Sequence, residues 1–138
     1  MIVSRKEMLE IEEKSGLSSF ELINLVGKKL ATHLLPYLEV NSNILILSGN
    51  GNNGADSFAL ISNLKQFHIN LILVSGLPKN SDAMKLYKQV PSSIIQPLSS
   101  LDTCLKNCDV IIDGIFGFGY HGKLTDEMRA VFKQIQNA

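Results

Sequence analysis

The chain has 138 residues, of which 45% are hydrophobic and 19% are charged, and 13 basic residues balance 13 acidic ones. This length predicts one domain with a buried core. The charge balance gives no bulk field that would attract nucleic acid or a membrane surface, so we expect neither as a partner. The charged N-terminus, Met1 to Lys14, does not resemble a signal peptide, and no apolar run is long enough to span a bilayer.

Two helices are predicted in the first forty residues. The first covers Val3–Ser15 and stops at Gly16. The second begins at Ser18 or Ser19, where a capping side chain can accept from the first free amides, and it continues to Leu34. Pro36 then ends it.

From Asn43 onward, short apolar runs alternate with amphipathic segments. Continuous apolar strands separated by helices predict an α/β fold, a Rossmann-like three-layer αβα sandwich with a mostly parallel sheet. We expect a last helix over Thr125–Gln136 and no strand after it. The expected strands are Ile44–Ser48, Leu71–Ser75, Ser93–Gln96 and Asp109–Asp113, and the expected helices between them are Ala55–Gln66, Ser81–Gln89 and Leu101–Asn107.

The first predicted strand runs into a glycine-rich segment, Gly49–Asp56. Glycines allow a ligand to approach the backbone, and the amides at a helix start bind anions. Three asparagines and an aspartate add side-chain oxygens, which points to a cation or polyhydroxyl ligand as well as phosphate. The segment also matches G-x-G-x-x-G, but the second strand is followed by no acid until Asp82, which argues against an ordinary NAD dehydrogenase.

A second glycine-rich segment, Asp113–Gly122, follows the fourth predicted strand and is expected to be a loop. Ligands of open α/β sheets bind outside the carboxyl ends of the strands. If the first and fourth strands are neighbours, Asn53 and Asp56 face Asp113 across one crevice.

These two segments carry a resemblance to a known family. Gly49–Asp56 resembles the G-x-G-N-N-G-G-D motif of the YjeF N-terminal domain family, the NAD(P)H-hydrate epimerases. Residues Asp113–Gly119 are similar to its D-A-[IL]-F-G-[TF]-G motif, and Glu21–Gly27 more loosely to its L-M-E-x-A-G helix. The motifs occur in the family's order over nearly the whole chain.

The resemblance implies an isomerase that interconverts the R and S epimers of hydrated NADH and NADPH in nucleotide repair. It implies potassium as the cofactor, with oxygens from Asn53 and Asp113. Oligomeric state is not readable, although a homodimer through the N-terminal helices fits the family. The implied substrate-binding residues are Asn52, Asn53, Gly54, Ala55, Asp56, Gly117, Phe118, Gly119, Tyr120, His121, Gly122 and Lys123.

The sequence departs from the family pattern at three places. Ala55 and Asn24 stand where the family has glycine and glutamate. The family's later D-x-P-S-G motif, which carries an acid/base aspartate, would lie beyond Ala138. We therefore expect residues 1–138 to be a domain that is incomplete at its C-terminus, with its catalytic residue unknown and weak activity on its own.

Plainer interpretations stay open for several residues. Asp56 could be a first-turn acid that the helix dipole stabilises, and Asp113 could cap a turn. Asp109, at the opposite sheet edge, is expected to be structural. Cys104 and Cys108 lack histidine partners for zinc, and they predict a reducing, cytoplasmic setting. At the level of function, a non-catalytic nucleotide-binding or protein-interaction module and a nicotinamide-dependent oxidoreductase domain are the alternatives.

Overall fold

The sheet of this protein has six strands in the order β1-β6-β5-β2-β3-β4 in our computed structural model, which describes residues 2–3, 18–50, 52–115 and 118–121. Strands β5, β2, β3 and β4 run parallel, whereas β6 is antiparallel to both β5 and β1. The strands are β1 (Ile2–Val3), β2 (Asn43–Ser48), β3 (His68–Leu73), β4 (Ile95–Gln96), β5 (Val110–Gly114) and β6 (Phe118–His121).

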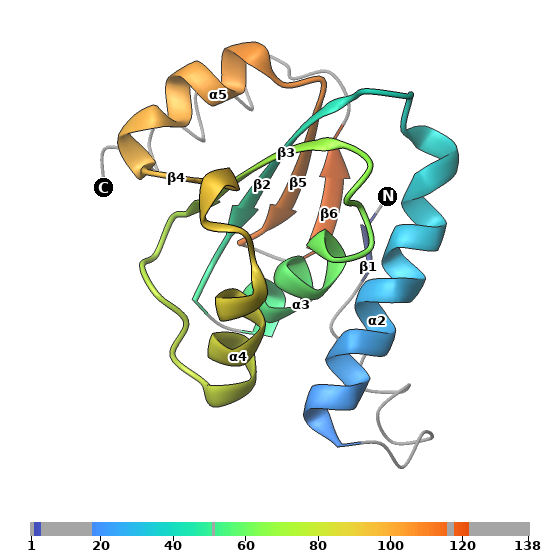
Figure 1. The fold of residues 1–138 in the computed structure, drawn as a ribbon, viewed down its shortest axis with the longest axis vertical. Coiled ribbons are helices and arrows are strands. Elements are labelled where there is room, and N and C mark those ends of the chain that lie inside the picture. The colour runs from blue at the N-terminus through green and yellow to red at the C-terminus, as the bar shows by residue number, and fades with distance from the viewer. Residues whose placement is uncertain (1, 4–17, 51, 116–117, 122–138) are drawn as a thin grey trace.

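Helices cover both faces of the sheet, and α5 lies on the opposite face from the other three (Figure 1). Helix α3 packs between α2 and α4. Three short 3₁₀ turns join these elements. The helices are α2 (Ser19–Leu34), α3 (Asn52–Ile61), α4 (Ser81–Gln89) and α5 (Leu101–Asn107), and the turns are η1 (Leu35–Tyr37), η2 (Ser92–Ile94) and η3 (Leu98–Ser100).

The central strand β2 shows why two helical layers are needed. Its side chains alternate between the faces, as in any strand. Ile44 and Ile46 belong to the core under α2, α3 and α4, whereas Leu45 and Leu47 belong to the core under α5. Because all four side chains are at most 1% exposed, both faces of this strand are buried, as expected for a parallel sheet. The predicted three-layer α/β fold is confirmed.

Local capping and close packing fix the helical layer. The Ser18 side chain accepts a hydrogen bond from the Glu21 amide and donates one to the Glu21 carboxylate, at 3.2 and 2.9 Å, so the second predicted helix begins where its capping residues indicated. Farther along α2, a Cβ at Gly27 would lie 2.6 Å from the Cβ of Ala59. Glycine at this position therefore lets α2 and α3 approach each other closely.

The described boundaries agree with the sequence expectation for α2, α4 and α5, lie within one residue of it for β2 and β5, and differ more elsewhere. Helix α3 begins three residues earlier than expected, at Asn52, and ends at Ile61 rather than Gln66. Strand β3 runs from His68 to Leu73 rather than from Leu71 to Ser75. Its pairing with β2 begins at His68, opposite Asn43, and ends at Leu73, opposite Ser48. The first half of the predicted strand over residues 93–96 belongs to a 3₁₀ turn, and its second half, Ile95–Gln96, forms strand β4.

The antiparallel edge of the sheet corrects two predictions. The segment over residues 113–122 is not a continuous loop, because Phe118–His121 forms strand β6. Val3 is not helical but pairs with Phe118, and Ile2 pairs with Gly119. The rest of the first predicted helix and the predicted helix over 125–136 lie outside the described residues. The four predicted strands form the parallel part of the sheet, and these antiparallel pairings add two strands that the sequence did not predict.

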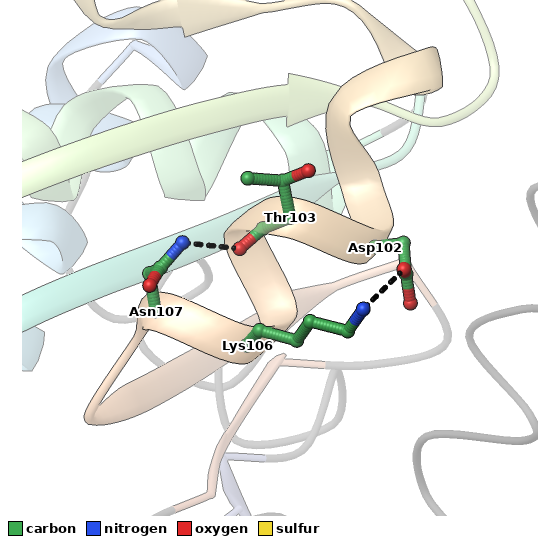
Figure 2. A network of polar contacts seen from close by, with 4 residues as sticks. All are labelled: Asp102, Thr103, Lys106 and Asn107. Atoms are coloured by element: carbon green, nitrogen blue, oxygen red, sulfur yellow. Dashed lines mark hydrogen bonds and ion pairs between the residues drawn. The ribbon is translucent and has the colours of Figure 1, made fainter.

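Helix α5 presents polar pairs on its surface, as Figure 2 shows. Lys106 Nζ lies 3.1 Å from Asp102 Oδ2, and the Asn107 side-chain amide donates to the Thr103 carbonyl at 2.9 Å. Both contacts join residues four apart on one helix, so they stabilise the helix locally. Within the described ranges, no helix has both the length and the apolar character to cross a membrane.

Candidate functional site

The glycine-rich turn between β2 and α3 brings strand and helix into direct contact. The buried Ser48 hydroxyl donates to the Gly49 carbonyl at 3.0 Å. A Cβ at Gly54 would overlap that same carbonyl oxygen and lie 2.9 Å from Ser48 Oγ. Gly54 is therefore the close-approach glycine of this segment. The start of α3 can sit directly on the end of β2 because no side chain separates them.

Asp56 is buried to an unusual degree for a carboxylate, with 1% of the residue exposed. Because α3 begins at Asn52, Asp56 lies beyond its first turn, and the interpretation of Asp56 as a first-turn acid is wrong. The residue has interaction partners within the fold, and its Oδ2 atom accepts no hydrogen bond from the described residues. Buried carboxylates are rare unless the fold or a ligand uses them.

The second segment begins beside the first, because β5 is the neighbour of β2. The Gly49 amide donates to the Gly114 carbonyl at 3.2 Å. Asp113 is half-buried, and its Oδ1 accepts from the Ile115 amide at 2.8 Å. This contact makes Asp113 a turn-capping residue as well as a candidate ligand. The expected adjacency of the two segments is confirmed.

The side chains of the two segments approach this edge from different faces. Asp113 alternates with Ile112, which belongs to the core under α3, so it shares the face of Ile111 under α5. Asp56 belongs to α3, on the other face. A shared ligand would therefore have to reach over the carboxyl edge of the sheet, at the contact between Gly49 and Gly114. Convergence of Asn53 with Asp113 stays a prediction, because the Asn53 side chain is not among those described.

The other residues that the sequence analysis selected fall into three groups. Ala55 is fully buried in the core with α2, so its methyl group packs inside the protein rather than at the turn. Asn52 and Asn53 open α3, and residues 118–121 form β6, whose backbone pairs with both neighbouring strands. The side chains of these six residues lie outside the description, and so do Gly117, Gly122 and Lys123 altogether.

Sequence reasoning missed a third wall at this edge, the segment between β3 and α4. The Asn50 side-chain amide donates to the Ser75 carbonyl, and the Lys79 amide donates to the Asn50 carbonyl, both at 3.2 Å. Gly76 turns the chain with φ of +83°, which favours glycine. The position of this segment after the strand beside β2 was the available signal.

Asp109 closes the opposite, amino edge of the sheet. The Asn43 amide donates to Asp109 Oδ2, and the Asp109 amide donates to the Asn43 carbonyl, both at 2.8 Å. These two bonds join the first residues of β2 to the approach to β5. The expected structural role of Asp109 is confirmed, and Asp109 is a suitable comparison for Asp113.

A cavity of about 450 Å³ also lies toward the amino edge, between the ends of α3 and α4. Its walls are largely apolar, and Lys65 is the charged residue among them. Its lining contains neither a carboxylate nor the start of an α-helix, unlike the carboxyl edge, so we do not assign a nucleotide to it. The apolar side chains in its walls include Phe58, Ile61, Ile69, Leu86 and Val90.

The donors at the carboxyl edge are oxygens, which suit hard cations rather than thiophilic metals. Among the described residues, no group of three or more histidine, cysteine or acidic side chains is arranged around one point. Neither cysteine of the described α5 region is disulfide-bonded. Burial raises the pKa of the Cys104 thiol, and that thiol lies on α5, away from the glycine-rich turn.

Fold and site together define the class: a Rossmann-like α/β domain with a glycine-rich turn at the carboxyl edge of a parallel sheet, where open α/β sheets bind their ligands. The chain belongs to the YjeF-related protein N-terminus family, whose model matches residues 19–138. A crystal structure of the yeast protein YNL200c has the same fold, with a TM-score of 0.64 and 20% sequence identity over 99% of this chain and 66% of that one.

Several relatives have names that describe an activity. An NAD(P)H-hydrate epimerase of Caenorhabditis elegans is 28% identical over 97% of this chain and 59% of its own length. One of Fusarium vanettenii is 27% identical over 92% of the chain and 55% of its own length. A bifunctional NAD(P)H-hydrate repair enzyme of Dictyoglomus turgidum is 29% identical over 99% of the chain. The chain spans 29% of that enzyme and little more than half of the two epimerases.

Proposed function

We propose that this chain is an NAD(P)H-hydrate epimerase domain that binds hydrated NADH or NADPH and serves the interconversion of their R and S forms. Family membership and the names of the relatives support this proposal. The observation that carries it is the buried carboxylate of Asp56 in the helix that Gly49–Gly54 opens. A nicotinamide-dependent oxidoreductase is less well supported, because such a domain has an acid directly after the second strand to bind the ribose. Here the first acid after β3 is Asp82, which lies inside α4.

The chemistry requires inversion at a ring carbon that bears a hydroxyl group. Release and return of water, or opening of the ring, needs acid and base groups held near that carbon. In the proposed complex, the amides at the start of α3 bind the phosphate groups. A carboxyl group removed from bulk water, such as that of Asp56, orients the substrate hydroxyl group, or the positively charged ring that forms when an acid protonates that hydroxyl group and water leaves.

Potassium is part of the proposal. Asp113 supplies a half-buried carboxylate, of which Oδ1 already accepts from Ile115, and Asn53 would add an amide oxygen. This all-oxygen donor set fits a hard monovalent cation. When bound, the ion would supply a fixed positive charge against the phosphate or carboxamide oxygens of the nucleotide.

The test compares Asp56→Asn with Asp102→Asn. The first substitution replaces a buried carboxyl group by an amide of nearly the same shape, and the second makes the same change at a partly exposed carboxyl group on α5 (Figure 2). We expect Asp56→Asn to lower epimerisation about 10²-fold, measured by chiral chromatography of the R and S hydrates, while Asp102→Asn leaves the rate unchanged. Calorimetric titration with the hydrates measures binding separately, and circular dichroism checks the fold.

Three results would contradict the proposal in different ways. No binding of hydrated nucleotide would reject the nucleotide site. Binding without epimerisation by a chain extended past Ala138, with potassium present, would favour the non-catalytic module. A normal rate in Asp56→Asn would remove Asp56 from the chemistry and leave Asp113 as the acid to test. We further propose a reducing, cytoplasmic location, supported by two cysteines that form no disulfide, and a homodimer through the N-terminal region, which sedimentation would test.

A further inference from the structure

The segment Ser75–Asn80 lies directly beside the proposed nucleotide site. Two hydrogen bonds at 3.2 Å join Ser75 and Lys79 to Asn50, and a third at 3.0 Å joins the Val74 amide to the Ser48 carbonyl. The segment is therefore held against the glycine-rich turn at both ends. A Cβ at Gly76 would meet no atom within 4 Å, so the space over its turn is open.

The charge of this segment is unusual for a wall next to a dinucleotide. It contains no acid, and its one charged residue is Lys79, which is exposed. The nearest acid along the chain, Asp82, lies in the first turn of α4. The segment therefore carries a lysine and no acid in the stretch after β3, where an NAD-binding site carries a carboxylate.

The chemistry of the ribose makes this difference decisive. In parallel α/β nucleotide sites, the residues after the strand next to the glycine loop contact the adenosine ribose. An acid there accepts from a 2′-hydroxyl, whereas a basic side chain accommodates a 2′-phosphate. An acid would also repel the doubly charged phosphate. We propose that Lys79 is a specificity-determining residue that binds the 2′-phosphate, so that this chain binds hydrated NADPH more tightly than hydrated NADH.

This inference rests on the proposed function, since it needs the nucleotide to lie across the carboxyl edge of the sheet. A charge-assisted contact of this kind is expected to change affinity about tenfold. Because Lys79 holds Asn50 through its backbone amide rather than its side chain, its substitution leaves that bond in place. The fold should therefore tolerate changes at this position.

The experiment is calorimetric titration of the chain with hydrated NADPH and hydrated NADH at two salt concentrations. We expect about tenfold tighter binding of hydrated NADPH by the native chain. Lys79→Ala should remove most of this preference and leave hydrated NADH binding unchanged, Lys79→Arg should keep it, and Lys79→Glu should reverse it. Lys65→Ala, a change of another exposed lysine at the opposite edge, is the matched control.

The outcomes separate this inference from the function on which it rests. Binding of neither hydrate by the native chain would reject the proposed function and this inference with it. Equal binding of both hydrates, or an equal loss of both in Lys79→Ala, would overturn the inference and leave the proposed function intact. A loss of preference in Lys65→Ala as well would show a general charge effect and would also overturn it.

Discussion

Substitution of Gly54 by alanine tests the contact on which the candidate site is built. The new Cβ would overlap the Gly49 carbonyl oxygen and lie 2.9 Å from Ser48 Oγ. The first of these atoms is backbone at the end of β2, so it cannot turn aside as a flexible side chain would. Helix α3 must therefore move away from the strand, and its first amides must move with it.

The expected cost follows from this overlap. Forcing one extra carbon into a close-packed region costs about 1–3 kcal/mol. Alanine also has a higher helix propensity than glycine, which stabilises the folded state by at most about 1 kcal/mol. With the full gain from alanine, the net loss in the free energy of unfolding is up to about 2 kcal/mol. For a domain of this size, a loss of about 2 kcal/mol corresponds to a decrease of roughly 6–10 °C in Tm.

The assay is urea and thermal unfolding followed by circular dichroism, with Gly49→Ala as the matched control. A Cβ at Gly49 would lie 3.5 Å or more from its nearest neighbours, an ordinary contact, so this control should stay within about 0.5 kcal/mol of the native chain. Hydrated nucleotide should also bind more weakly to Gly54→Ala than to Gly49→Ala. Equal stability and equal binding of the two variants would refute the reasoning.

Two further predictions concern charges and thiols elsewhere in the described structure. Asp113→Ala should weaken potassium-dependent nucleotide binding far more than Asp109→Ala does. The Asp109→Ala variant should instead lose about 1 kcal/mol of stability, because it loses the hydrogen bond from the Asn43 amide. Titration in potassium and in tetramethylammonium measures the binding, and equal binding losses in the two variants would count against the assignment. Cys104 should react with iodoacetamide at pH 8 more slowly than free cysteine does, because burial raises the pKa of its thiol and leaves less thiolate. Mass spectrometry of timed samples measures the rate, and a rate equal to that of free cysteine would contradict the expectation.

The elements that the sequence predicted well are those with local signals. Helix α4 begins after Asn80, whose side chain accepts from the Ala83 amide at 2.8 Å, and α2 begins after Ser18 in the same way. Such caps act over three residues and can be read directly from the chain. The apolar runs of β2 and β5 likewise predicted buried parallel strands, and the two are neighbours as expected.

The candidate site was predicted in part. The sequence indicated the two glycine-rich segments and placed both at the carboxyl edge, because parallel strands all end at one edge. The sequence showed an alanine at position 55 where the family has glycine, and the structure buries Ala55 in the core and places the close approach to the strand at Gly54. Helix α3 begins at Asn52, three residues before the expected start, and this start determines that Gly54 rather than Ala55 faces the strand.

Tertiary structure alone decided the remaining features, since they depend on segments that are distant in the sequence. The antiparallel edge exists because Ile2 pairs with Gly119, and no local pattern at either end predicts that pairing. The contact of Lys79 with Asn50 likewise depends on β3 lying beside β2. Sequence periodicity reports which face of an element is apolar, but the partner of that element follows from packing and backbone pairing across the whole chain.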